Sequence, residues 1–318
     1  MGTKLLLDVD PGCDDAIALF LALAADDVDV VGVTTVMGNT TLENTTRNTL
    51  SLLEFVDRTD VPVAAGAARP LAQELTTAEH VHGPGGLPER VRAAVPESDV
   101  TVVDAHAAAF IVEQAHEYGE ELTIAAVGPQ TNLALALALE PALPDLVGDI
   151  YAMGGALKTT GNVTPQASFN FYVDAAAASR VVQEAAPKVV GLDVTEHVYV
   201  STDEIRRLAE EPEPLATMAK ILEFSVEEVR SKFGHDGGLA SDAVVLTDVI
   251  AGALEFEDAY VEIDTSGGPS NGATVYDEHG VYGEDPNCQV ALGVDGDAYE
   301  ETVVRLLETY GGRSARSL

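Results

Sequence analysis

The fold is decided by the stretch LLLDVDPGCDDAIALFLALA at residues 5–24. Residues 4–9 form an apolar run typical of a buried strand, and Pro11-Gly12 is typical of a turn. Residues 15–25 have the composition of a helix, and the acidic start suits the positive end of a helix dipole. The stretch therefore predicts a strand, a turn and a helix, with four aspartates on the connection.

The same alternation of strand and helix continues along the chain. Further strands are expected at 29–36, 61–64, 123–127, 149–153 and 188–192, with helices at 40–56, 133–139 and 174–186. This order predicts an α/β fold with a mostly parallel, Rossmann-like central sheet, helices on both faces, and ligands bound at the carboxyl ends of the strands. We expect residues 1–318 to form one domain, residues 66–96 to form a long loop or insertion near the site, and residues 311–318 to form a frayed tail.

The charge of the chain limits its partners. Seventeen Lys and Arg against 53 Asp and Glu give a net charge of −36, which repels nucleic acids and anionic membranes. The acids are spread along the whole chain, so we interpret them as a solvated surface suited to high salt and take a halophilic source as a hypothesis. No signal-type cleavage site and no membrane-length apolar run are found, and Cys13 and Cys288 are too few for a disulfide framework. We therefore expect a cytoplasmic protein.

The aspartates at positions 8, 10, 14 and 15 indicate a cation site. Four carboxylates gathered in a desolvated crevice repel one another or become protonated, and a hard cation removes that cost. Ca²⁺ accepts several carboxylate and carbonyl oxygens in flexible geometry. The spacing is not that of an EF-hand, because Leu19 stands where that loop has its Glu. Surface decoration is the simpler alternative, but the apolar flanks on both sides argue against it.

The run from Asp8 to Ala16 resembles the signature of the inosine-uridine preferring nucleoside hydrolase family. The other shared landmarks, in chain order, are Gly38-Asn39, His82-Gly83, Gly86-Leu87, Val127-Gly128-Pro129, Thr131-Asn132-Leu133, Met153-Gly154-Gly155, Asn162, Phe169-Asn170 and Ser241-Asp242. They cover nearly the whole chain. The resemblance implies Ca²⁺-dependent hydrolysis of the N-glycosidic bond of a pyrimidine or purine ribonucleoside to ribose and free base, by a homo-oligomer such as a dimer or tetramer.

The resemblance also implies roles for matching residues. The metal ligands would be Asp10, Asp15, Asp242 and the backbone carbonyl of Val127. Asp10 would also act as general base to the metal-bound water, and Asp14 would bind a ribose hydroxyl. Asp8 would have a supporting role. The side chains implied to hold the ribose and the water are Asn39, Asn162 and Asn170, with Met153 packed beside the sugar.

Physical chemistry agrees with these roles. Cleaving the N-glycosidic bond builds positive charge on the ribose, so nearby carboxylates and amide oxygens stabilise the transition state more than the ground state. A metal lowers the pKa of its water, and a carboxylate such as Asp10 can then take the proton.

Two positions depart from the family pattern. Ser168 stands where the family has a Glu that contacts the 5′ side of the ribose, and Ser241 stands where purine-active members have a His that protonates the leaving base. The loop histidine His82 is the candidate replacement acid, because imidazole titrates near neutrality. His80 and His235 are weaker candidates and are interpreted as surface residues.

Two other functions stay open at this point. The pair Asp8-x-Asp10 after an apolar strand resembles the nucleophile motif of haloacid-dehalogenase-type phosphatases, although Pro11-Gly12 and the following acid pair fit that motif poorly. A non-catalytic riboside-binding protein of the same fold is favoured by Ser168 and Ser241. Nucleoside hydrolysis remains the leading hypothesis.

Overall fold

A computed structural model describes residues 2–312 of the chain. Its centre is an eight-stranded sheet with the strand order β3-β2-β1-β4-β5-β6-β12-β9. Neighbouring strands are parallel except β12 and β9, which are antiparallel. The strands of this sheet are β1 (Thr3–Val9), β2 (Val28–Thr35), β3 (Val63–Ala65), β4 (Leu122–Ala126), β5 (Asp149–Met153), β6 (Lys188–Val190), β9 (Leu254–Ala259) and β12 (Cys288–Val294).

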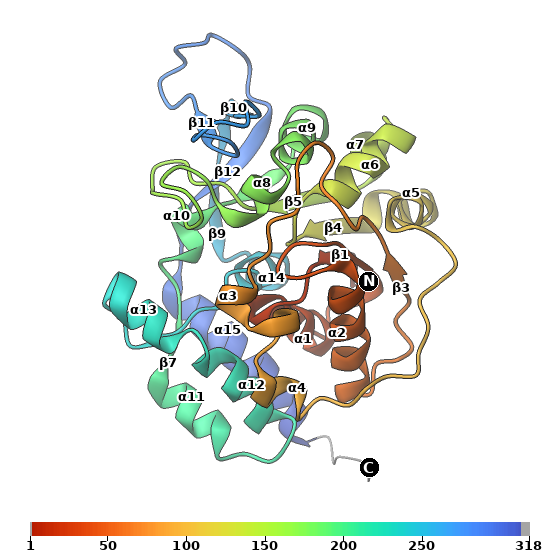
Figure 1. The fold of residues 1–318 in the computed structure, drawn as a ribbon, viewed down its shortest axis with the longest axis vertical. Helices are drawn as coiled ribbons and strands as arrows, with labels where there is room; N and C mark the ends of the chain where they lie inside the picture. Colours follow the sequence, from red (N-terminus) through yellow and green to blue (C-terminus); the bar gives the residue numbers. More distant parts are fainter. Residues whose placement is uncertain (1, 313–318) are drawn as a thin grey trace.

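Helices cover both faces of this sheet (Figure 1). The longer helices are α1 (Cys13–Ala24), α2 (Leu42–Phe55), α5 (Ala107–Tyr118), α6 (Thr131–Leu139), α9 (Ala175–Ala185), α11 (Thr202–Ala209), α12 (Leu215–Glu223), α13 (Val226–Phe233), α14 (Ala243–Ala251) and α15 (Gly296–Glu308). The predicted α/β fold with a mostly parallel central sheet is therefore confirmed.

Strand β1 shows how the sequence builds two cores. Because side chains alternate along a strand, Leu5 and Leu7 pack on one face with α1, whereas Leu6 packs on the other face with Phe110 of α5. Both faces are dry, which explains why the strand is apolar without alternation. Helix α1 is buried nearly all round because α12, α14 and α15 cover its outer side.

The remaining elements are short. Residues 66–96, predicted as a loop or insertion, contain three one-turn helices: α3 (Glu79–His82), η1 (Pro84–Gly86), which packs against α2, and α4 (Glu89–Arg92), which packs against α12. The other short helices are η2 (Gly119–Glu121), α7 (Leu143–Leu146), α8 (Phe169–Val173), α10 (Leu192–Thr195) and η3 (Thr309–Gly312). The small two-stranded sheets pair β7 (Val200–Ser201) with β8 (Gly237–Gly238) and β10 (Val261–Ile263) with β11 (Thr274–Tyr276).

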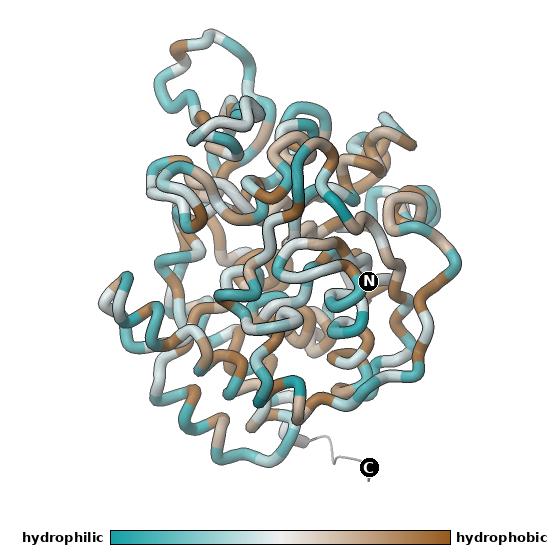
Figure 2. The backbone as a smooth tube through the Cα atoms, in the orientation of Figure 1, coloured by the Kyte–Doolittle hydropathy of each residue, from teal (hydrophilic) through white to brown (hydrophobic). Residues whose placement is uncertain are grey.

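The described part of the chain ends in a short turn, and one outer loop projects from the body (Figure 2). The frayed tail was predicted from residue 311; residues 311–312 end the η3 turn, and residues 313–318 lie outside the described part. The loop between β11 and β12 projects from the body and is mostly hydrophilic (Figure 2). Among residues 2–312, no helix combines the length and the apolar character needed to cross a membrane.

Candidate active site

A cavity of about 330 Å³ lies at the carboxyl ends of the parallel strands. Asp10 follows β1, Val127 follows β4 and Met153 ends β5, so adjacent strands deliver all three to one edge. Of the predicted site residues, only Asp15 does not line this cavity. The predicted residues that do are Asp10, Asp14, Asn39, His82, Val127, Met153, Asn162, Ser168, Asn170, Ser241 and Asp242.

Asp10 is held in one orientation at the floor of the cavity. Its Oδ2 accepts a hydrogen bond from the Asn39 backbone N–H at 2.7 Å, and its carbonyl accepts one from Asn39 Nδ2 at 3.1 Å. Gly38 and Gly128 flank the carboxylate; a Cβ at Gly128 would stand 2.8 Å from Asp10 Oδ1, and one at Gly38 would meet Oδ2. These two glycines are therefore required by the close approach of the carboxylate.

Asp15 does not line the cavity, and its carboxylate holds the turn between β1 and α1 by hydrogen bonds. Its Oδ1 accepts from the Asp10 N–H at 2.9 Å, and its Oδ2 accepts from the Gly12 N–H at 2.9 Å and from Asn39 Nδ2 at 3.1 Å. The carboxylate thus links the end of β1, the start of α1 and the loop after β2. A carboxylate oxygen has more than one lone pair, so these bonds leave capacity for a cation.

Three carboxylates converge in a way that suits a metal ion. Ligand oxygens of Asp14, Asp15 and Asp242 lie within 4.8 Å of one another, and the buried Oδ1 of Asp14 has no hydrogen-bond partner in the structure. Burial raises the pKa of Asp15 to about 6, and the adjacent Asp14 carboxylate adds to this effect. Burial also raises the pKa values of Asp10 and Asp242 well above the ordinary range, and the surrounding carboxylates add to it. An all-oxygen set of one half-buried and two buried acids fits a hard divalent cation.

The carbonyl of Val127, the fourth predicted ligand, is partly engaged. Asn170 Nδ2 donates to it at 2.6 Å and also lies 3.3 Å from the Met153 carbonyl. A carbonyl has two lone pairs, so one remains for a cation. Asn170 links the ends of β4 and β5 at the site.

His82 reaches the cavity from α3, in the segment above the sheet edge. Its Nδ1 accepts from the Cys13 backbone N–H at 3.3 Å and lies 4.0 Å from Asp14 Oδ1. With Nδ1 accepting, the neutral ring carries its proton on Nε2. Asn48 fixes the segment by donating to the carbonyls of Pro11 and Gly85, at 3.2 and 2.9 Å. The imidazole is therefore a positioned donor.

The two serine positions have different surroundings. Ser168 is buried, and its Oγ accepts from the Gly155 N–H at 2.6 Å, so the hydroxyl secures the turn after β5. Asn162 Oδ1 secures the same segment by accepting from the Phe169 N–H at 2.9 Å. Ser241 precedes α14 and lines the cavity beside Asp242.

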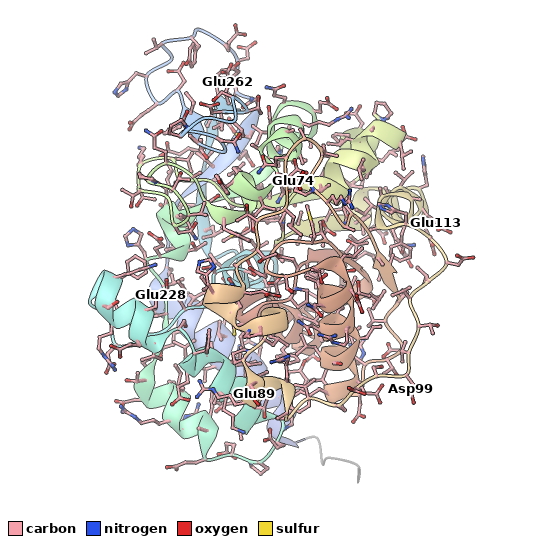
Figure 3. All side chains as sticks on the ribbon, in the orientation of Figure 1. Glu74, Glu89, Asp99, Glu113, Glu228 and Glu262 are labelled. Atoms are coloured by element: carbon pink, nitrogen blue, oxygen red, sulfur yellow. The ribbon has the colours of Figure 1, made fainter. Side chains whose placement is uncertain are left out.

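Several residues near the site were not predicted, or lie elsewhere. Glu228 and Lys232 of α13 line the cavity, yet in the sequence they resemble an ordinary surface pair four residues apart. Figure 3 labels Glu228 between α13 and α3. His80 lines the cavity too, whereas His235 stacks on Tyr199 with ring centroids 4.8 Å apart and does not.

Asp8 is a buried structural group. Its Oδ1 accepts from Thr34 Oγ1 at 2.6 Å and from Asn132 Nδ2 at 2.8 Å, and it does not line the cavity. Burial raises the pKa of Asp8 to about 7, against the lowering effect of these two bonds. The nucleophile of a haloacid-dehalogenase-type phosphatase must reach its substrate. Asp8, the residue that would have this role, does not line the cavity.

The fold and the site together define the class: an α/β enzyme whose cavity is built from buried carboxylates and amides at the ends of parallel strands. Comparison with known proteins agrees. The family model described as inosine-uridine preferring nucleoside hydrolase matches residues 5–301. The pyrimidine-specific ribonucleoside hydrolase RihA of Escherichia coli O8 (strain IAI1) is 38% identical over 314 residues, covering 98% of this chain and 100% of the relative.

Solved structures give the same result. A plant nucleoside hydrolase, the PpNRh1 enzyme, has a TM-score of 0.86 at 29% identity and covers 98% of this chain and 100% of its own. A purine-preferring ribonucleoside hydrolase from Gardnerella vaginalis has a TM-score of 0.87 at 26% identity, with 97% and 99% covered. The chain belongs to the inosine-uridine preferring nucleoside hydrolase family and is a ribonucleoside hydrolase. The phosphatase alternative is therefore wrong.

Proposed function

We propose that this enzyme hydrolyses the N-glycosidic bond of pyrimidine ribonucleosides in a Ca²⁺-dependent reaction, with Asp10 as the general base. The observation that supports the Ca²⁺ dependence is the convergence of Asp14, Asp15 and Asp242, with the unpartnered Asp14 oxygen among them. Two of these three, Asp15 and Asp242, are proposed ligands together with Asp10 and the Val127 carbonyl, which the resemblance implies, whereas Asp14 is assigned to the ribose. These ligands would hold Ca²⁺, which would supply a water of lowered pKa and positive charge for the vicinal ribose hydroxyls.

Each of the protein groups then has a separate role in the reaction. Asp10 takes the proton of the attacking water, since its carboxylate is buried and fixed by Asn39. Asp14 binds a ribose hydroxyl. The carboxylates and the amide oxygens of Asn162 and Asn170 stabilise the positive charge that develops on the ribose. Met153 packs beside the sugar.

His82 is the proposed acid that protonates the leaving base. A neutral imidazole does not give up its Nε2 proton at neutral pH, so the acid would be the imidazolium form, in which Nδ1 also carries a proton and no longer accepts the Cys13 N–H. Ser241 stands where the family resemblance implies a second imidazole, and an alcohol does not donate its proton at neutral pH. A pyrimidine preference fits this difference and the pyrimidine-specific name of the 38% identical relative.

Release of reducing sugar from uridine, cytidine, inosine and adenosine tests the proposal. The assay uses high-salt buffer with Ca²⁺, and we expect uridine and cytidine to be cleaved fastest. Ribose must be the sugar product, and the 2′-deoxyribosides must be poor substrates, because the vicinal hydroxyls are proposed metal ligands. Tight binding of ribosides without any sugar release would support the non-catalytic alternative instead.

Substitution Ser241→His tests the assignment of base preference. We expect kcat/KM for inosine to rise by about tenfold or more, because a positioned acid contributes ~10²–10⁴-fold to such reactions. The value for uridine should change by less than about threefold. Initial rates with both substrates provide the measurement, and Ser270→His, outside the cavity, is the matched control. An equal gain on both substrates would contradict the assignment.

A homo-oligomer, a cytoplasmic location and adaptation to high salt stay predictions. Sedimentation velocity and reversible unfolding, both measured from low to molar salt, test the first and the third. Stability indifferent to salt would count against the acidic surface as a salt adaptation.

A further inference from the structure

A second, smaller cavity of about 130 Å³ shares part of its lining with the first. The residues common to both include Asp14, His82, Asn162, Glu228, Lys232 and Ser241. Asp10 and Asn170 line only the first cavity, whereas the apolar side chains of Phe224, Val229 and Phe233 line only the second. The shared residues therefore mark the passage from the metal and ribose half toward an apolar compartment suited to a flat ring.

Lys232 stands at this passage on the last turn of α13. Its Nζ pairs with Glu228 Oε1 at 2.5 Å, one helical turn back, and the two side chains are 53% and 44% exposed. Exposed pairs of this kind contribute little to stability, so the fold does not depend on Lys232. Among the described residues that line the two cavities, Lys232 is the one lysine or arginine.

The other cation of α13 serves as a contrast. Arg230 pairs with Glu227 at 3.0 Å and with Asp236 at 2.6 Å and lines neither cavity. The neighbourhood of Lys232 is otherwise acidic: Glu196, half-buried in the second cavity, lies close enough for Lys232 to lower its pKa, although burial raises that pKa overall. The helix thus turns one cation toward the passage and one away from it.

The reaction separates charge along this direction. When the C1′–N1 bond of a pyrimidine nucleoside breaks, both electrons go to the base and spread over N1 and the exocyclic O2. The ribose becomes positive at the carboxylate end of the site, and the base becomes negative at the end where Ser241 replaces an imidazole. A cation placed at the base end stabilises the transition state more than the ground state.

We propose that the Lys232 ammonium contacts the exocyclic oxygen of the departing pyrimidine and stabilises its negative charge, with Glu228 holding the ammonium in place. Lys232 keeps its protons throughout, while the base receives its proton from His82 and water adds to C1′. The inference rests on the proposed function, and it makes Lys232 a catalytic residue specific to bases with such an oxygen.

Two substrates with different leaving groups provide the test. The base of uridine leaves slowly unless its negative charge is stabilised. The leaving group of p-nitrophenyl β-D-ribofuranoside is a stable anion that departs without such stabilisation. We expect Lys232→Met to lower kcat for uridine by about 10- to 100-fold, less than a fully buried donor because the site is half-exposed. The nitrophenyl riboside should lose less than about threefold, which also shows that the variant is folded.

Matched variants complete the design. Arg230→Met should leave both rates within about twofold, and Lys232→Arg should retain most uridine activity because the charge remains. Equal losses on both substrates with Lys232→Met, or no loss on uridine, would overturn the role of Lys232. Wild-type enzyme that cleaves neither substrate, or only the nitrophenyl riboside, would overturn the proposed function itself, whereas wild-type activity on uridine without a selective loss in Lys232→Met would overturn this inference alone.

Discussion

Replacing Asp10 by Asn should lower kcat for uridine by about 10³-fold or more, close to 4 kcal/mol in activation free energy. The substitution keeps the shape of the side chain, and its oxygen can still accept from the Asn39 N–H. It removes the group proposed to take the proton from water and one negative charge from the proposed metal ligands. Stopped assays of ribose release, at saturating uridine and Ca²⁺, give the measurement.

Asp8→Asn is the control for this prediction. Asp8 lies on β1, two residues before Asp10, and is as buried as Asp10, but its carboxylate accepts from Thr34 and Asn132 away from the cavity. We expect the variant to keep activity within about tenfold and to show its effect in stability instead. An Asp10→Asn enzyme with rates similar to those of Asp8→Asn would remove Asp10 from the role of general base.

The strand, turn and helix at the N-terminus could be predicted because local signals agree there. An apolar run ends at Asp8, Pro11-Gly12 breaks it, and a helix with acids in its first turn follows. The parallel sheet follows from repetition of this unit, since parallel strands bring their carboxyl ends to one edge. That geometry explains why Asp10, Val127 and Met153, far apart in the sequence, line one cavity.

The base end of the site could not be predicted in the same way. Helix α13 lies far from the N-terminal signature in the sequence, and its Glu228 and Lys232 match the common pattern of a solvated helix face. Only tertiary packing turns that face toward His82. The strand order has a similar limit, because β12 enters between β6 and β9 from the end of the chain.

Ser168 shows why a departure from a family pattern needs a structure. The sequence shows a lost carboxylate at a position implied to contact the 5′ side of the ribose. The structure shows what the serine does, which is to accept from the Gly155 N–H in a buried turn. The hydroxyl therefore has a structural partner. A substitution of Ser168 would change both the contact to the 5′ side of the ribose and the stability of the turn after β5.

Removing the metal should abolish activity and reverse the pH dependence of stability. We expect EGTA to lower the rate on uridine by about 100-fold or more, and excess Ca²⁺ to restore it. Without metal, the carboxyl of the proposed ligand Asp15 has a folded-state pKa of about 6, and that of Asp8, away from the cavity, has one of about 7 with or without metal, both raised by burial. Their unfolded value is about 3.9. The stability they contribute is thus full below pH ~4 and is lost as pH rises through 6 to 7.

We expect Ca²⁺ to act against the loss at Asp15, because it would bind the ionised form of the proposed ligands. At about 100 times its Kd a ligand stabilises the fold by about 2.7 kcal/mol, which raises Tm by about 4 °C in a chain of this size. We expect that rise at pH 8 and a smaller one at pH 5, where protons compete for Asp10, Asp15 and Asp242. Thermal unfolding with EGTA or Ca²⁺ at both pH values measures it.

Two variants separate the buried cluster from the acidic surface. Asp242→Asn removes a proposed ligand and should reduce the Ca²⁺-dependent rise in Tm at pH 8, whereas Asp297→Asn, exposed in the first turn of α15, should leave it unchanged. Both variants remove one negative charge, so a general response of the −36 surface to cations would affect them equally. Equal reductions in the two variants, or equal Tm rises at pH 5 and pH 8, would show that Ca²⁺ stabilises through the surface and not through the carboxylates of the cavity.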